Sequence, residues 1–266
     1  MGAGEQDLLN VLRLVVGGAV DSVFEGMSSS TTTPAGAAAP FGAVRERERK
    51  FVATARGSLR FLERLAVRTV EEVPDRARPV TYNRTTYLDT ADLRYLRSRQ
   101  SGPARKLRIR EYASSAIEGV APSLHPVCFL ELKESHGGAR VKTRLQMDPA
   151  SLAPLLAGRA GKASAVPPHE TLRALLERDR PVPKVTSWYR RTTRLDRDRS
   201  LRITVDTGIC FTEPVAPGSI PESAFPENAF ARLPFTIVEV KCPGELPSWL
   251  VTELDSLAEV HGFSIC

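Results

Sequence analysis

Six segments of the chain carry charged side chains at alternate positions, and side chains of these types can bind a polyanion together with a metal ion. The charged positions are Glu46, Glu48 and Lys50; Lys106, Arg108 and Arg110; Glu131 and Lys133; Arg140, Lys142 and Arg144; Arg202 and Asp206; and Glu239 and Lys241. Ten of these side chains are basic and can neutralise phosphate groups. The five acidic ones supply the oxygen ligands that a hard divalent cation prefers.

Residues two apart lie on the same face of a β-strand, so each segment is predicted to be a strand with one charged face. The intervening positions are mostly aliphatic, as with Leu107 and Ile109. Two arrangements fit this pattern. An antiparallel sheet could bury its apolar face and present its charges to water. Alternatively, the strands could close into a barrel with the charges inside, where they would need a polyanion and a cation as partners.

Three features favour the closed barrel. The chain has enough predicted helices to cover an apolar outer face. The segments KLRIR and RVKTR are purely basic on one side, whereas solvent-facing strands usually mix charges of both signs with neutral polar residues. Finally, the acidic positions Glu46, Glu48, Glu131 and Glu239 match the ligand preference of a divalent cation.

Composition limits the class of protein and of partner. The 266 residues include 37 Lys and Arg against 31 Asp and Glu, a net charge of +6 that favours an anionic partner. The four cysteines are far apart in sequence, and the first residues, MGAGEQ, lack a basic signal region, so we expect a cytoplasmic protein. Aromatic residues are sparse in the basic strands, which argues against a nucleic-acid partner.

Two regions follow from the pattern along the chain. Residues 1–43 are predicted to hold an N-terminal helix and a flexible linker, because 28–40 is rich in Ser, Thr, Ala and Pro. Residues 44–266 are predicted to form the folded domain. Helical spacing is found at 57–72, 90–99, 149–157, 168–179 and 246–260, and five prolines within 212–234 predict a long surface loop.

Several motifs, in order along the chain, resemble a known family. The run ERERK at 46–50 resembles the ExExK signature of the triphosphate tunnel metalloenzymes, the superfamily that includes the CYTH proteins. The later motifs resemble its VTC branch, and the resemblance covers about 44–266. They are TTYLDTADLRYLRSR (85–99), GPARKLRIREY (102–112), CFLELKES (128–135), RVKTR (140–144), VTSWYRRTTR (185–194), LRITVDTGICF (201–211) and IVEVKCPGELPSWL (237–250).

The resemblance implies an α+β fold, a closed eight-stranded antiparallel β-barrel with helices packed on the outside and a triphosphate-binding tunnel within. It implies a metal-dependent polyphosphate polymerase that transfers the γ-phosphoryl group of ATP onto a growing polyphosphate chain. A triphosphatase of the same fold and a non-catalytic polyphosphate-binding module are the alternatives. Mn²⁺ or Mg²⁺ is the implied cofactor, and analogy with eukaryotic relatives implies an associated membrane protein.

The resemblance also assigns residues. Seven basic residues match phosphate ligands, and Arg144 and Arg202 are added because they share the same strand faces. The seven are Lys50, Arg108, Arg110, Lys133, Lys142, Arg191 and Lys241. Glu239 would be the main metal ligand, assisted by Glu46 and Glu48, while Glu131, Tyr87 and Asp89 are further candidates near the tunnel.

Two positions depart from the family pattern. Ile265 stands where VTC chains have a lysine, and Ser135 stands where the eukaryotic polymerase has a histidine. The departures concern polymerase activity rather than phosphate binding.

A polymerase needs no strong general base, because the end of a phosphate chain is already ionised. A hydrolase needs one, and repulsion within the pair Glu46 and Glu48 is expected to raise the pKa of one carboxyl group.

Overall fold

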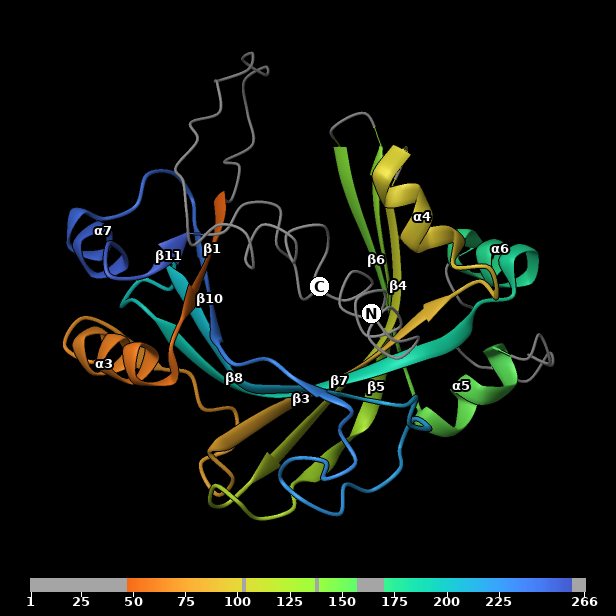
Figure 1. The fold of residues 1–266 in the computed structure, drawn as a ribbon, viewed down its shortest axis with the longest axis horizontal. Coiled ribbons are helices and arrows are strands. Elements are labelled where there is room, and N and C mark those ends of the chain that lie inside the picture. The colour runs from red at the N-terminus through yellow and green to blue at the C-terminus, as the bar shows by residue number, and fades with distance from the viewer. Residues whose placement is uncertain (1–46, 102–103, 137–138, 157–169, 260–266) are drawn as a thin grey trace, which may run out of the picture. The chain divides into compact units, whose positions relative to one another are not determined.

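A computed structural model describes residues 47–101, 104–136, 139–156 and 170–259. The expected N-terminal helix, Glu46 and Ile265 lie outside these described residues. Figure 1 labels most of the described elements. They are β1 (Arg47–Ala53), α3 (Ala55–Leu65), β2 (Val70–Glu71), β3 (Val80–Asp89), α4 (Arg94–Ser101), β4 (Ala104–Ser115), β5 (Ser123–His136), β6 (Ala139–Met147), α5 (Pro149–Leu156), α6 (Glu170–Asp179), β7 (Val182–Leu195), β8 (Arg202–Thr212), β9 (Ala231–Arg232), β10 (Thr236–Cys242), α7 (Ser248–Leu254) and β11 (Ala258–Glu259). None of the described helices is both long enough and apolar enough to cross a membrane.

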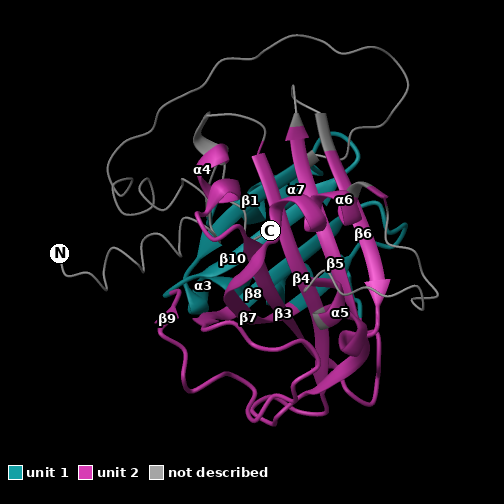
Figure 2. Ribbon diagram, turned by 90° about the vertical axis from the view of Figure 1, so that its right-hand side faces the viewer, with its two compact units in different colours: residues 1–72, 192–207, 234–266 teal, residues 73–191, 208–233 magenta. Residues whose placement is uncertain are grey.

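The chain divides into two compact units, which Figure 2 colours separately. Unit 1 comprises residues 1–72, 192–207 and 234–266, and unit 2 comprises 73–191 and 208–233. Strands β7 and β8 are neighbours in the sheet, and each passes from one unit into the other.

Unit 1 buries the apolar face of β1, β10 and β8 beneath two helices. Val238 and Val240 of β10 and Ile203 of β8 pack with Phe61 of α3 and Leu250 of α7, among other residues. Helix α3 begins at a side-chain cap, because Thr54 Oγ1 accepts a hydrogen bond of 3.0 Å from the amide of Gly57. With the apolar positions fixed toward the helices, the alternate positions of these strands must lie on the opposite face.

Unit 2 follows the same principle with three helices. Leu107 and Ile109 of β4 and Leu130 and Leu132 of β5 are fully buried, and they pack with α4, α5 and α6. Further along the same unit, Trp188 of β7 stacks on Tyr82 of β3, with ring centroids 5.7 Å apart. The predicted division into apolar and charged strand faces is therefore found in each unit.

The described strands form one antiparallel sheet, so the predicted α+β class is confirmed, but they do not form the predicted closed barrel. The order of pairing is β11-β1-β10-β8-β7-β3-β4-β5-β6, with β2 beside β7 and β9 beside β8. Among the described residues, the end strands β11 and β6 are not paired with each other. Closure requires the end strands to hydrogen-bond along their length, and the described part of β11 has two residues against nine in β6. The charged side chains along β6 also oppose edge pairing.

Two predicted helices are shorter in the structure than the sequence pattern indicates. The helix expected over 57–72 ends at Leu65, and Val70 pairs instead with Leu195 of β7. The helix expected over 246–260 ends at Leu254, and Ala258 pairs with Val52 of β1. In both places, pairing with a strand distant in sequence takes residues that helical spacing alone would assign to the helix.

The proline-rich loop after β8 is held to unit 2 by a buried ion pair. The guanidinium of Arg84 donates to both carboxylate oxygens of Glu111, at 2.8 and 2.9 Å, and both side chains are buried. Glu111 also accepts a hydrogen bond of 2.7 Å from the amide of Gly218, and Arg84 donates to the carbonyl of Ser219 at 2.8 Å. This pair therefore joins β3 and β4 to the loop.

We predict that Glu111→Ala lowers the free energy of unfolding by about 3–5 kcal/mol, because the buried Arg84 guanidinium loses its carboxylate. Urea denaturation of the purified chain measures this change. The matched control is Glu134→Gln on β5, since Glu134 forms a partly exposed pair with Arg105 at 2.7 Å. Its loss is expected to change stability by about 0–1 kcal/mol. Equal effects of the two substitutions would contradict the role given to Arg84 and Glu111.

Candidate functional site

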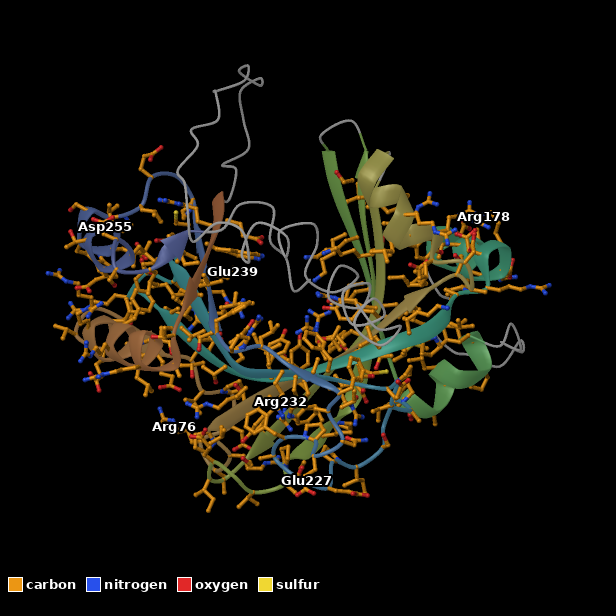
Figure 3. The ribbon with its side chains drawn as sticks, viewed as in Figure 1. Arg76, Arg178, Glu227, Arg232, Glu239 and Asp255 are labelled. Carbon is orange, nitrogen blue, oxygen red and sulfur yellow. The ribbon has the colours of Figure 1, made fainter. Side chains whose placement is uncertain are left out.

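Four of the predicted site residues meet on β1 and β10 in unit 1. Lys50 is opposite Glu239 in the strand register, and Glu48 is opposite Lys241. The buried Lys50 ammonium donates to Glu239 Oε2 at 2.8 Å and also bonds to Glu48. Lys241 Nζ lies 3.1 Å from Glu239 Oε1 and 3.5 Å from Glu48 Oε2. Each ammonium group thus contacts both carboxylates; Figure 3 labels Glu239 on β10.

The expected raised pKa is not found at Glu48. Burial and the nearby Glu239 carboxylate raise the pKa of Glu48, but the charge and hydrogen bond of Lys50 and the charge of Lys241 outweigh them. The net pKa of Glu48 lies below its ordinary value. Glu48 is therefore held as a carboxylate, which suits a metal ligand better than a general base.

The donor set of unit 1 fits a divalent cation of the Mg²⁺ type. Within the described ranges, no group of three His, Cys, Asp or Glu side chains is placed to hold a metal ion. However, Mg²⁺ is commonly held by one or two carboxylates, with phosphate oxygens and water completing its shell. Glu48 and Glu239 supply two carboxylates that already converge on shared cations.

A basic face covers β4, β5 and β6 in unit 2. Lys106, Lys133 and Lys142 are directly opposite one another across these three strands, and Arg108, Glu131 and Arg144 form the next row. Arg110 follows on β4. Among the described side chains on this face of the three strands, six are basic and only Glu131 is acidic. Like charges directly opposite one another repel, so the face favours an anionic ligand.

Glu131 is the centre of this face and is almost fully buried, with 2% of its surface exposed. Its carboxylate accepts from Arg108 Nε at 2.7 Å and lies 2.9 Å from Lys142 Nζ and 3.2 Å from Arg144 Nε. Burial alone would raise the pKa of Glu131, but the Arg108 charge, the hydrogen bonds from Lys142 and Arg108, and the Arg110 charge lower it to about 2. Glu131 is thus a counter-ion shared by three cations.

Aromatic rings contact several cations of unit 2. The guanidinium carbon of Arg144 lies 3.6 Å from the centroid of the Phe129 ring. Arg110 donates to the hydroxyl of Tyr189 at 2.7 Å, and the guanidinium of Arg191 lies 5.4 Å from the centroid of the same ring. Arg108 and Arg110 are buried, with 5% and 3% of their surfaces exposed. These two residues therefore differ from the first arrangement considered above, in which a sheet presents its charged face to water.

The remaining predicted residues lie in other surroundings. Arg202 is opposite Lys241 in register but is half-exposed, and its guanidinium is 3.9 Å from Glu72. Tyr87 is buried opposite Arg108. Asp89 accepts hydrogen bonds from the amides of Thr90, Tyr95 and Leu96 at 2.7, 2.9 and 3.0 Å, which places it at the start of α4. This geometry gives Asp89 a structural role in fixing the helix.

The structure also shows a candidate residue that charge alone does not reveal. Thr204 of β8 is opposite Glu239, is buried, and its hydroxyl has no hydrogen-bond partner among the described residues. In the sequence it lies between Arg202 and Asp206 at the same alternate positions, so the strand period places it on the charged face.

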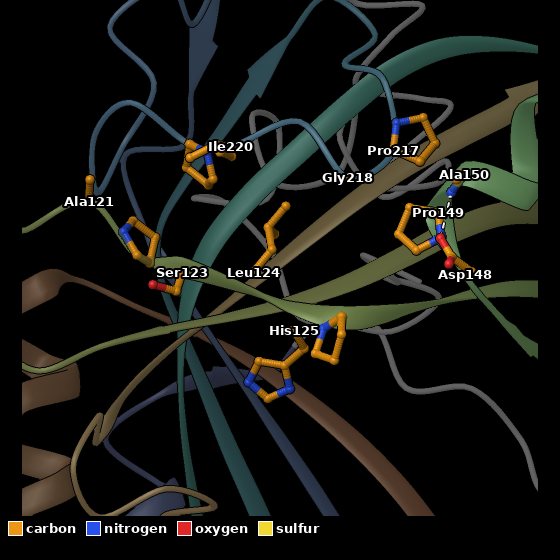
Figure 4. Close-up of a pocket in the computed structure, with 13 residues that line it drawn as sticks. Ala121, Ser123, Leu124, His125, Asp148, Pro149, Ala150, Pro217, Gly218 and Ile220 are labelled. Atoms are coloured by element: carbon orange, nitrogen blue, oxygen red, sulfur yellow. Dashed lines mark hydrogen bonds between the residues drawn. The ribbon is translucent and has the colours of Figure 1, made fainter.

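A separate pocket of about 700 Å³ lies in unit 2, lined by residues 121–126, 148–150, 217–218 and 220–221 (Figure 4). Five of its lining residues are prolines, and its titratable side chains are His125 and Asp148. None of the predicted phosphate or metal ligands lines it. This pocket therefore lacks the cations that the basic face provides.

Comparison with known proteins identifies the family. The VTC domain model matches residues 47–265, so the chain belongs to the VTC domain family. No curated protein matches the chain. Among solved structures, an adenylate cyclase candidate from Bacillus halodurans is 15% identical, with 78% of this chain and 84% of that chain covered and a TM-score of 0.43. A Pyrococcus horikoshii protein is 12% identical, with coverages of 79% and 85% and a TM-score of 0.40. These TM-scores are too low to transfer a fold or a function.

We predict that Glu131→Gln lowers the free energy of unfolding at neutral pH by about 3 kcal/mol, because buried Arg108 loses its carboxylate partner. Because the folded-state pKa of about 2 lies below the ordinary 4.5, the unfolded chain binds more protons between these values. The Glu131 contribution is therefore present above about pH 4.5 and is lost as the pH falls toward 2. Denaturant unfolding at several pH values measures the difference between wild type and variant.

The difference is expected to shrink steadily over that window. Glu134→Gln is the control, since Glu134 lies on the same strand and pairs with Arg105 away from the basic face. A stability difference for Glu131→Gln that is independent of pH would contradict the assignment of Glu131 as an ionised counter-ion.

Proposed function

We propose that the chain is a metal-dependent polyphosphate polymerase that transfers the γ-phosphoryl group of ATP onto inorganic polyphosphate. The observation that carries the proposal is the basic face of unit 2, where six described cations share the face with one described carboxylate, Glu131, which contacts three of them. Membership of the VTC domain family supports the same substrate class. A chain of phosphates supplies the repeated negative charge that such a row of cations requires.

The residues support phosphoryl transfer through alignment and electrostatics. Arg108 and Arg110 present planar guanidinium groups that can bind two phosphate oxygens at once, while Lys133 and Lys142 act as compact point charges. These cations would hold the phosphates in line and stabilise the charge that spreads over the equatorial oxygens in the transition state. No strong general base is required when the acceptor is an ionised phosphate.

Glu48 and Glu239 would hold the Mg²⁺ or Mn²⁺ ion, which supplies charge neutralisation at the transferring phosphate when it is bound. Lys50 and Lys241 lie within bonding distance of both carboxylates and fix their orientation. In unit 1 these lysines can bind phosphate oxygens in place of the carboxylates, because a lysine side chain is flexible and its ammonium group has three donors.

One assay separates the proposal from its alternatives. The full chain is incubated with ATP and Mn²⁺, and the products are analysed on a polyphosphate gel and by release of free phosphate. Long chains are the expected product. Free phosphate without chains would establish a triphosphatase, and tight polyphosphate binding without turnover would establish a binding module.

We predict that Glu239→Gln reduces metal-dependent turnover on the order of 100-fold, because a neutral amide is a much weaker ligand for a hard cation. Binding of Mn²⁺, measured by titration calorimetry, is expected to weaken in parallel. Glu134→Gln is the matched control, since Glu134 pairs with Arg105 and is predicted to keep wild-type turnover. Unchanged turnover and Mn²⁺ binding in Glu239→Gln would refute the metal assignment.

A further inference from the structure

Three neighbouring side chains in unit 2 form a row across strands β4, β3 and β7. Arg110 is directly opposite Thr85, and Thr85 is directly opposite Ser187. All three are buried, with 3%, 0% and 0% of their surfaces exposed. Side chains directly opposite one another in a sheet share a face, so their polar groups are adjacent.

Each member of the row has a polar atom whose bonding the described residues do not satisfy. Arg110 Nε, Thr85 Oγ1 and Ser187 Oγ are buried, and none has a hydrogen-bond partner in the described part of the chain. Another nitrogen of Arg110 donates to the Tyr189 hydroxyl at 2.7 Å, which fixes the guanidinium in place. Buried polar groups in native proteins are nearly always bonded, so three such atoms in one row indicate a ligand.

The adjacent positions on the same two strands provide a direct comparison. Thr86 and Thr186 are also buried, but their hydroxyls bond to each other at 2.8 Å. Thr186 additionally accepts a hydrogen bond of 3.1 Å from the amide of Val215. The fold therefore satisfies the hydroxyl groups of Thr86 and Thr186 and leaves those of Thr85 and Ser187 for another partner.

We propose that Thr85 and Ser187, together with Arg110 Nε, form a phosphate subsite in which two neutral hydroxyls donate hydrogen bonds to phosphate oxygens beside a fixed guanidinium. The assignment of Thr85 and Ser187 rests on the proposed function, since it concerns the same class of phosphate ligand. Hydroxyl donors add directional bonds to an anion without adding further positive charge to a face that already carries six described cations.

Titration calorimetry of the full chain with inorganic tripolyphosphate tests the subsite. Thr85→Val removes the hydroxyl and keeps the side-chain shape, and Ser187→Ala removes the second hydroxyl. Each is expected to weaken binding on the order of tenfold or more, because a hydrogen bond to a charged group is lost. Thr85→Ser retains the hydroxyl and is expected to bind within a few-fold of wild type. Thr86→Val, on the opposite face, is the matched control and is expected to bind as wild type does.

Thermal unfolding without ligand gives an independent readout. Thr86→Val loses the bond to Thr186 and is expected to lower the melting temperature by about 2–4 °C. Thr85→Val is expected to leave it unchanged or higher, because the hydroxyl it removes has no described partner. A stability loss in Thr85→Val equal to that of Thr86→Val would show that the hydroxyl is already bonded in the free protein and would overturn the subsite.

Failure of the subsite can be distinguished from failure of the proposed function. If wild type binds tripolyphosphate but Thr85→Val and Ser187→Ala bind it equally well, the subsite is wrong and the proposed function stands. If wild type does not bind tripolyphosphate, both are wrong. Should Thr85→Val fail to fold, the comparison of Ser187→Ala and Thr85→Ser with wild type decides the question.

Discussion

Unit 2 holds cations in register across β4, β5 and β6. Their mutual repulsion is the constraint that the rest of the unit must offset. The opposite face of these strands carries Leu107, Ile109, Leu130 and Leu132, all buried beneath helices. Moving any strand by one residue would exchange leucine and isoleucine for lysine and arginine in that core. The hydrophobic core therefore holds the cations together against their own repulsion, and the stored electrostatic energy is available to an anion that binds them.

Glu131 offsets part of the repulsion among these cations in the free protein. A single buried carboxylate contacts Arg108, Lys142 and Arg144, so three cations share one counter-ion. More carboxylates on this face would stabilise the free chain and would also compete with a phosphate ligand. The stability of the free chain and its affinity for an anion are therefore opposed on this face. The same holds for the neutral hydroxyl groups of Thr85 and Ser187, which have no described partner in the free chain and are therefore available to a ligand.

The sequence was sufficient to predict which side chains share a face but not how the strands are joined at the ends of the sheet. Alternation placed Arg108 with Arg110 and Glu239 with Lys241 correctly, because a period of two is a local property of a strand. Closing the sheet into a barrel depends on pairing between strands that are distant in sequence. The described residues of β11 lie in a segment whose spacing is typical of a helix, so the pattern did not predict a strand there. Thr85 and Ser187 carry no charge, so only the register of β3 against β4 and β7 brings them to Arg110. The role of Asp89 did leave a local signal, since Asp and Thr often precede a helix.

The acidic residues differ in whether a ligand could exchange their partners. Asp89 is bonded to backbone amides, and Glu111 to a buried guanidinium and a backbone amide, so neither can be released without disrupting the fold. Glu48 and Glu239 are bonded to lysine ammonium groups, which sit at the ends of flexible side chains. A phosphate offers these ammonium groups new acceptors, and the carboxylates then need another cation. Among these four acidic residues, Glu48 and Glu239 are accordingly the pair to which the proposed function assigns the metal ion, because their partners can move while the fold stays intact.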